Sequence, residues 1–563
     1  MTDNIFLVQE LLREYGRKRT SPKCLMKIDF RKAFDSVQWG FLESLLGMLG
    51  LPSQFVHLIM QCVSSASFSV GVNGNLYGFF KGQSGIRQGD PLSPYLFICC
   101  MEYFSRMLKQ SSDLPGFNYH PKCSSLGISH IAFADDVLLL CRGDPGSVGI
   151  MHQQLQSFGN VSGLDLNPSK SSIYFGGVKE TVKADILQMT GFVEGSFPFT
   201  YLGVPLSPHR LLTSQYTPLL NKLESAIQGW MGKFLSYAGR LELLRSVLNG
   251  MVQFWIGIFP IPGVVLSRII RICRSFLWSG CIGKRTALVA WHRVCLPKTE
   301  GGLGLLDLKA RSKTVIAGHI WNIHLKTDSI WIQWVHHFYL GSCAIWDAQA
   351  STTSSPLWKA ILSLKNHIQD ACGNQGAAIS LVRSWDSRDS FSRNAYDYFR
   401  LRGDEVNWLR VVWDSWSMPR YNFILWLAAL GKLRTKDRLQ FMSLDPLCLL
   451  CSQDNESHRH LFFECNWSAQ LWNSIKSWMR INQQITSLSS ALWELNKGGH
   501  SMENRLRRIS LGITVYLIWE ERNNRVFNSN RLSVGNIFRK FQVMFFTTFH
   551  FREKDHHTLR FGS

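Results

Sequence analysis

Acidic residues are scarce in this chain: 40 Asp and Glu stand against 61 Lys and Arg among 563 residues, for a net charge of +21. A surplus this large is typical of proteins that bind a polyanion, either nucleic acid or an acidic membrane surface. A soluble basic protein without such a partner is the alternative. Charged residues make up only 18% of the chain and apolar residues 45%, which excludes a disordered protein. The length suits three or four domains.

Long apolar runs are also missing. The longest apolar tract, residues 252–266, is interrupted by Gln253, Pro260 and Pro262 and falls short of the roughly 20 residues that a membrane-spanning helix needs. The first ten residues do not have the basic start and apolar stretch of a signal peptide. The 14 Cys follow no regular framework, which favours a reducing compartment. We therefore expect an intracellular protein that does not span a membrane.

Hydrophobic periodicity predicts an α+β fold for the first two hundred residues and helices beyond them. Residues 24–30 alternate as in a strand, with Met26, Ile28 and Phe30 on one face. Asn73-Gly74 predicts a hairpin turn. After residue 206, apolar residues recur at helical spacing, and a Ser/Thr-rich stretch predicts a linker. The expected segments are 1–206, a helical 207–347, a linker region 348–385, a Cys/His-containing 386–480 and a helical basic tail 481–563.

Asp135-Asp136 is the only Asp-Asp pair in the chain, and it separates two apolar runs. Two carboxylates at a tight turn repel each other, and a bound divalent cation relieves that repulsion. A solvated hairpin turn is the simpler alternative on the pair alone. Asp29 ends the polar face of a strand, so it can lie beside the pair. Three carboxylates on adjacent strands can hold two Mg²⁺ about 4 Å apart. Asp35 is a second candidate but is more simply a helix N-cap.

Two loops are suited to a nucleotide and a nucleic-acid strand. Residues 84–90, SGIRQGD, place two glycines where backbone can approach a ligand closely. Arg87 can bind a phosphate and Gln88 a base or sugar edge, although an ordinary loop is equally compatible. Lys170 lies in a turn from which it can protonate a leaving pyrophosphate, but a surface lysine is the commoner case.

A Cys/His cluster follows near residue 450. Cys448 and Cys451 form a Cys-x-x-Cys pair, with His458, His460 and Cys465 close behind. One such pair arises easily by chance, but an added His and Cys within about 15 residues favour a four-ligand zinc site over a metal-free buried cluster. Four protein ligands leave no open catalytic position, so the predicted Zn²⁺ is structural or contacts nucleic acid.

Together these segments resemble the reverse transcriptases of non-LTR retrotransposons, the long interspersed elements, with the plant type most similar. Five motifs occur in order: 27–37 (KIDFRKAFDSV), 84–97 (SGIRQGDPLSPYLF), 133–136 (FADD), 163–171 (GLDLNPSKS) and 201–206 (YLGVPL). The resemblance covers nearly the whole chain. It implies a right-hand polymerase palm, an antiparallel sheet with helices, followed by a helical thumb and an α-rich zinc-binding C-terminal region.

The resemblance also implies roles for individual residues. The Mg²⁺ ligands would be Asp29, Asp135 and Asp136, and Lys170 would be the general acid. Phe34 would exclude a ribose 2′-hydroxyl, although a core aromatic is an equal alternative, and Gln88 and Gly89 would line the nucleotide pocket beside Arg87. The zinc ligands would be Cys448, Cys451, His460 and Cys465, leaving His458 spare.

Only 28 residues precede Asp29, so we expect the endonuclease domain of related proteins to be absent and the fingers largely missing. The leading hypothesis is an RNA-directed DNA polymerase that extends a DNA primer with dNTPs on an RNA template, with a partner supplying cleavage. An inactive remnant that only binds nucleic acid is the second, and a two-metal nuclease or phosphatase a distant third. We expect no ribonuclease H activity, and a nuclear location with a cytoplasmic ribonucleoprotein stage.

Overall fold

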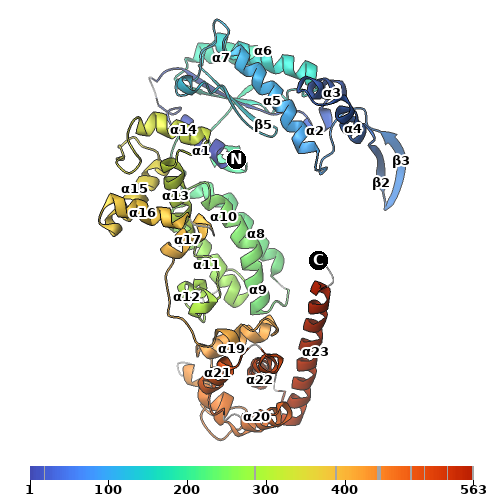
Figure 1. Ribbon diagram of the computed structural model, residues 1–563, viewed down its shortest axis with the longest axis vertical. Coiled ribbons are helices and arrows are strands. Elements are labelled where there is room, and N and C mark those ends of the chain that lie inside the picture. Colours follow the sequence, from blue (N-terminus) through green and yellow to red (C-terminus); the bar gives the residue numbers. More distant parts are fainter. Residues whose placement is uncertain are drawn as a thin grey trace. The chain divides into compact units, whose positions relative to one another are not determined.

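The computed structural model divides the chain into two compact units (Figure 1). Unit 1 comprises Met1–Gln215, Gly257–Pro260 and Ile316–Ser384, and unit 2 comprises Tyr216–Ile256, Ile261–Val315 and Trp385–Ser563. The residues that the structure describes are 1–17, 20–231, 233–283, 287–386, 390–439, 445–481, 485–499, 501–528 and 530–560.

A five-stranded sheet forms the centre of unit 1, in the order β4-β5-β1-β6-β7. Its strands are β1 (Lys23–Ile28), β4 (His130–Phe133), β5 (Asp136–Cys141), β6 (Ser172–Gly176) and β7 (Val193–Glu194). The central strand β1 pairs antiparallel with both β5 and β6. The expected α+β palm with a central antiparallel arrangement is therefore present.

The edge strand β7 corrects the prediction of an antiparallel sheet. It runs parallel to β6, with Ser172 opposite Val193, so the sheet is mixed. Helix α7 (Glu180–Thr190) lies between the two strands in the chain and carries the chain back to the starting end of β6, as a parallel connection requires.

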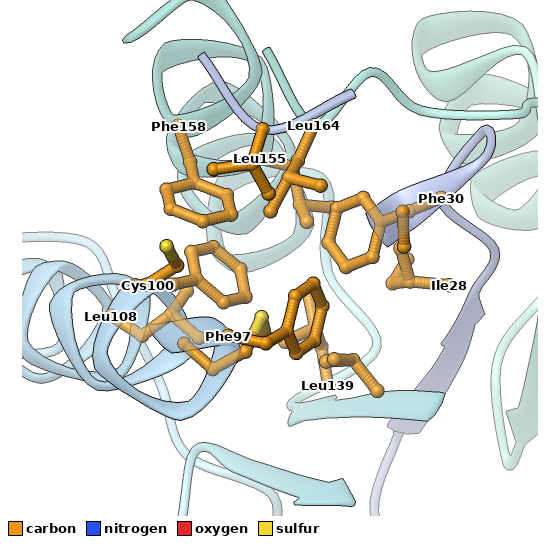
Figure 2. Packing of buried hydrophobic residues seen from close by; sticks show 14 of the residues in the cluster. Ile28, Phe30, Phe97, Cys100, Leu108, Leu139, Leu155, Phe158 and Leu164 are labelled. Carbon is orange, nitrogen blue, oxygen red and sulfur yellow. The ribbon is translucent and has the colours of Figure 1, made fainter. Parts of the chain in front are cut away.

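Helices α5 (Ser93–Ser111) and α6 (Pro145–Ser162) pack on one face of this sheet (Figures 1 and 2). Alternate strand residues supply the apolar side of the interface, because successive side chains of a strand point to opposite faces. Met26, Ile28 and Phe30 all lie in this core, as the alternation in the sequence predicts. Phe158 stacks on Phe104 at its centre, with 4.7 Å between the ring centroids.

The opposite face of the sheet is covered by the short hairpin β8 (Phe199–Tyr201) and β9 (Val204–Leu206). Tyr174 of β6 packs on Phe199, with 4.4 Å between ring centroids. Lys27, on the polar alternation of β1, donates a hydrogen bond to the carbonyl of Thr200 (2.8 Å). Both faces of the central strand are therefore covered, which fixes its position.

Smaller elements complete unit 1. Helix α1 (Thr2–Leu12) packs on α14 (Ile330–Val335), and Asn4 donates a hydrogen bond to the carbonyl of Ala132 in β4 (3.0 Å). Helix α3 (Trp39–Met48) packs on α4 (Ser53–Ser64) and α5. The predicted hairpin is β2 (Ser67–Val72) and β3 (Asn75–Lys81), with Asn73 and Gly74 in its turn.

The stretch 348–385, expected as a linker region, is mostly helical. It contains α15 (Pro356–Cys372) and α16 (Gln375–Trp385). Ser355 caps α15 by accepting a hydrogen bond from the amide of Trp358, and the Trp358 side chain is buried. The Ser/Thr-rich residues before Pro356 thus supply a helix cap rather than only a flexible connection.

Unit 2 is helical throughout its regular structure in the described ranges. Its helices are α8 (Thr217–Trp230), α9 (Tyr237–Leu243), α10 (Asn249–Ile256), α11 (Gly263–Ser279), α12 (Trp291–Cys295), α17 (Phe391–Phe399), α18 (Leu409–Val412), α19 (Pro419–Ala429), α20 (Asn466–Met479), α21 (Leu488–Lys497), α22 (Met502–Phe527) and α23 (Val534–Arg560). Helix α13 (Leu308–His324) runs through the boundary between the units. Among the described residues, none of the helices has the length and apolar character needed to cross a membrane.

A short loop, residues 84–86, is hydrogen-bonded along the turn that contains α2 (Ala33–Ser36). The amides of Gly85 and Ile86 donate to the carbonyls of Val37 (2.8 Å) and Phe34 (2.7 Å). Gly85 has a φ of +87°, and a Cβ there would lie 2.6 Å from the carbonyl oxygen of Asp35. Only glycine allows this close approach of two backbones.

We expect Gly85→Ala to lower the free energy of unfolding by about 2 kcal/mol or more, because it adds a backbone clash to the strain of a positive φ. Gly89→Ala is the matched control, since Gly89 has a φ of +90° but open space around its Cβ position. Scanning calorimetry of both variants measures the difference. Equal destabilisation by the two substitutions would contradict the close approach.

Candidate functional site

The register of β1 and β5 brings two of the predicted carboxylates together. Ile28 of β1 lies opposite Val137 of β5, so the next residues outward, Asp29 and Asp136, face each other at the end of the strand pair. Asp29 directly follows β1 and Asp136 begins β5. Both carboxylates are half-buried.

Asp135 lies in the tight turn that joins β4 to β5. Phe133 pairs with Asp136, leaving Ala134 and Asp135 as the two turn residues. Ala134 has a φ of +52°, a left-handed conformation that costs a non-glycine residue energy and is often found at functional sites. The Asp135 side chain is exposed, so the strained turn presents this carboxylate to solvent beside the half-buried Asp136.

The electrostatics of Asp136 reflect this crowding. Burial raises its carboxyl pKa, and the negative charges of Asp135 and Asp29 raise it further, while Lys27 opposes them. A divalent cation with oxygen ligands fits such a carboxylate group, since it removes the mutual repulsion. Among the described residues, however, these carboxylates do not form a tight ligand group of the kind found in the Cys/His cluster below.

The 163–171 loop is attached directly to Asp29. Asn167 donates a side-chain hydrogen bond to Asp29 Oδ2 (3.1 Å), and the Asp29 amide donates to Ser171 Oγ (3.1 Å). Lys170 lies in the same turn, its amide bonded to the carbonyl of Asn167 (3.1 Å), and its side chain is exposed. Sequence reasoning missed the positioning contacts of Asn167 and Ser171, although both lie inside a recognised motif.

The residues predicted to line the nucleotide pocket differ in how exposed they are. Gln88 and Gly89 are exposed. Phe34 is half-buried and stacks on Phe97 of α5, with 4.7 Å between ring centroids and 12° between planes. It is therefore both a packed aromatic and partly accessible.

Arg87 forms a hydrogen bond within the fold that the sequence did not predict. Its Nη2 donates to the carbonyl of Cys62 (2.9 Å) near the carboxyl end of α4. The last carbonyls of a helix have no partner within it and carry partial negative charge, which attracts a guanidinium. Phosphate binding by Arg87 remains a prediction, and it requires that this contact be shared or broken.

The Cys/His cluster of unit 2 converges on one point. Cys448, Cys451, His460 and Cys465 each offer a ligand atom, and all four atoms lie within 4.8 Å of one another. Three sulfurs and one imidazole nitrogen are the donor set of structural zinc sites. The Sγ of Cys451 lies 3.3 Å from His460 Nε2 and the sulfurs of Cys448 and Cys465 are 3.9 Å apart, so the residues fit a tetrahedral Zn²⁺.

His458 is not part of this group. Its ring lies against Phe462, with 5.0 Å between the centroids, whereas His460 Nε2 faces the cysteines. Residues 460–464 form a single π-helical turn, in which the amide of Cys465 donates to the carbonyl of His460 (2.7 Å). This turn connects His460 to Cys465. Because His460 Nε2 faces the cysteines and His458 packs on Phe462, His460 is the histidine of the metal-binding cluster.

Two arginines of α22 hold the metal-binding loop in place. Arg525 Nη1 donates to the carbonyls of Leu449 (3.0 Å) and Leu450 (3.1 Å), the residues between the two cysteines of the Cys-x-x-Cys pair. Arg522 forms a buried ion pair with Glu456, with Nη2 2.8 Å from Oε1. The sequence gives no indication of these partners, because 66 or more residues separate them.

Comparison with known proteins assigns both modules. Residues 2–206 match the family described as reverse transcriptase (RNA-dependent DNA polymerase), and residues 391–472 match the family described as zinc-binding in reverse transcriptase. The chain thus carries an RNA-directed DNA polymerase domain followed by a domain with a zinc-binding Cys3His cluster.

Three individual relatives are similar to parts of this chain. The chain is 30% identical over 396 residues to a Pol polyprotein from the type-1 retrotransposable element R2 of Popillia japonica, covering 65% of this chain and 61% of the relative. It is 33% identical over 129 residues, 23% of this chain and 21% of the relative, to an Arabidopsis thaliana protein whose name assigns it to ribonuclease H. It is 36% identical over 107 residues, 18% of this chain, to an uncharacterized mitochondrial protein of Arabidopsis thaliana, of which it covers 85%.

The chain belongs to the reverse transcriptase family of non-LTR retrotransposons. It spans under two thirds of the length of the R2 polyprotein and about a fifth of the ribonuclease H relative.

We expect His460→Gln to abolish tight binding of one zinc equivalent, because it removes one of four converging ligands. His458→Gln is the matched control and should retain the full equivalent. Metal content after dialysis, measured by mass spectrometry, distinguishes them. Loss of zinc from the His458 variant with retention in the His460 variant would contradict the assignment of ligands.

Proposed function

We propose that this chain catalyses RNA-directed DNA synthesis by two-metal nucleotidyl transfer, adding dNTPs to a DNA 3′ end on an RNA template. The observation that carries the proposal is the pairing of β1 with β5, which sets Asp29 opposite Asp136 while the adjoining turn presents Asp135. Three carboxylates at the end of two central strands suit a reaction whose substrate is a triphosphate bound with Mg²⁺.

Asp29, Asp135 and Asp136 would hold the two Mg²⁺, which when bound supply charge stabilisation for the attacking and leaving oxygens. The protein's own part is to keep these three oxygen-donor groups close despite their repulsion. Asn167 does so for Asp29 through its hydrogen bond to Oδ2, and Lys27 does so for Asp136 by opposing the rise in its pKa.

Other residues would act on the substrate. Lys170, exposed on the turn that is bonded to Asp29, would donate a proton to the leaving pyrophosphate. The partly accessible ring of Phe34 would lie against the sugar and disfavour a 2′-hydroxyl. Gln88 and Gly89, exposed on the loop that is bonded to the Phe34 turn, would line the nucleotide pocket beside Arg87.

The partners follow from the family and from the charge. A net charge of +21 suits RNA template and DNA primer. A reaction on chromosomal DNA would place the chain in the nucleus after a cytoplasmic ribonucleoprotein stage.

We expect Asp135→Ala to reduce primer extension on an RNA template with Mg²⁺ by at least about 10²-fold, because a group that stabilises transition-state charge is lost. Asp185→Ala, which removes an exposed carboxylate of α7, should extend like the parent chain. No extension by the parent chain, with salt-sensitive RNA binding retained, would mean an inactive binding remnant.

Lys170→Ala should slow single-turnover incorporation by roughly 10²-fold, the usual size of a general-acid contribution. Lys179→Ala removes an equally exposed lysine and should leave the rate unchanged. A Lys170 variant that incorporates nucleotides at the parent's rate would exclude the proton-donor role.

A further inference from the structure

Three adjoining cavities run through unit 2 along helices α9, α11, α19 and α22, and we call them together the α9–α22 groove. Their volumes are about 920, 550 and 230 Å³. The first and second share Tyr237, Trp278 and Ser279, and the second and third share Arg240 and Ser279. The shared residues place the three cavities next to one another in unit 2.

The lining of the groove is basic. Among the described residues that line its three cavities, none is an Asp or Glu, although the chain has 40 of them. The cations are Lys233, Arg240, Arg420, Arg434, Lys436, Arg522 and Arg525. A concave surface with one sign of charge focuses its potential on an anionic ligand.

Four of these cations illustrate two different situations. Arg522 and Arg525 are nearly buried and paired with Glu456 and Glu521, so their charge is largely neutralised within the fold. Lys233 and Arg420 are exposed and unpaired with any carboxylate in the described residues. The charge that a ligand would meet therefore includes these two.

Aromatic rings alternate with the cations. Tyr516 and Trp519 are half-buried at the groove, with Arg420 over Tyr516, 5.8 Å from the ring centroid, and Arg522 over Trp519, 5.2 Å from its centroid. Tyr237 is already stacked on Phe423, with 5.2 Å between the centroids. Aromatic rings such as Tyr516 and Trp519 can stack with nucleobases.

A buried donor in the groove also lacks an acceptor. Trp278 lines both larger cavities and is only 4% exposed. Its indole Nε1 has no hydrogen-bond partner in the described residues. A buried N–H without a partner is costly, and an oxygen of a ligand in the groove would satisfy it.

We propose that the α9–α22 groove binds a single strand of nucleic acid, with its phosphates on Lys233 and Arg420 and its bases against the aromatic rings. The rings line cavities, which bases paired in a duplex cannot enter, so a single strand fits and a duplex does not. The site contains none of the palm residues. The proposal rests on the proposed function only for the expectation that this chain meets nucleic acid.

The test uses the full chain and a fluorescein-labelled 12-nucleotide U-rich RNA, with binding followed by anisotropy across a salt series. We expect Lys233→Glu/Arg420→Glu to weaken binding about tenfold or more. The slope of log K against log salt should fall by about 1.4, because two phosphate contacts on a single strand are lost. Lys222→Glu/Arg271→Glu, an equal charge change at exposed residues of α8 and α11 outside the lining, is the control.

The arms of the experiment separate the alternatives. Similar losses for RNA and the matching DNA strand would support recognition through phosphates and bases, and a loss for RNA alone would support the same groove with 2′-hydroxyl contacts. The proposal would be overturned if the groove variant and the control variant bound the RNA with equal affinity. It would also be overturned if the groove variant lost as much affinity for a blunt duplex as for the single strand. Primer extension blocked by Asp135→Ala is independent of these results, so failure of the groove and failure of the polymerase are distinguishable.

Discussion

The antiparallel pairing of β1 with β5 is the interaction on which the palm depends. Its register places Ile28 opposite Val137, which buries one alternate set of side chains under α5 and α6 and brings Asp29 opposite Asp136. A shift of one residue would turn the core residues outward and separate the carboxylates. The apolar burial of β1 and β5 thus holds two negative charges together that would otherwise move apart. Stability of the core and geometry of the site are fixed by one pairing.

Much of this palm could be predicted from the sequence, because its signals are local. The alternation over 24–30, the turn at Asn73-Gly74 and the Asp pair all need only neighbouring residues, and the structure has the strands and the hairpin where the patterns indicate them. The chemical roles of the carboxylates and of Lys170 stay predictions. Recognition of five motifs in order gave the family, which the comparisons confirm.

Features that depend on distant partners could not be predicted. The loop sequence predicts that Arg87 binds a phosphate. In the folded chain its guanidinium instead donates a hydrogen bond to the carbonyl of Cys62, near the end of α4. The parallel placement of β7 depends on the path of α7. Composition at 348–356 indicates a linker, but a helix begins at Pro356 and packs its Trp358 side chain into the interior. In each case, local composition was compatible with two outcomes and tertiary contacts selected one.

In unit 2, net charge alone does not show which cations are available to a ligand. Some cations there are structural: Arg522 with Glu456 is a buried pair whose disruption would cost several kcal/mol. Arg525 both lines the groove and donates to the carbonyls between Cys448 and Cys451. The metal-binding loop and one wall of the groove therefore share a side chain. A bound Zn²⁺ would fix the loop, and the loop carbonyls position the Arg525 guanidinium, which forms part of the groove wall. In this arrangement a metal site without an open coordination position would still shape the proposed nucleic-acid groove, by positioning a side chain of its wall rather than through the charge of Arg525, which Glu521 largely neutralises.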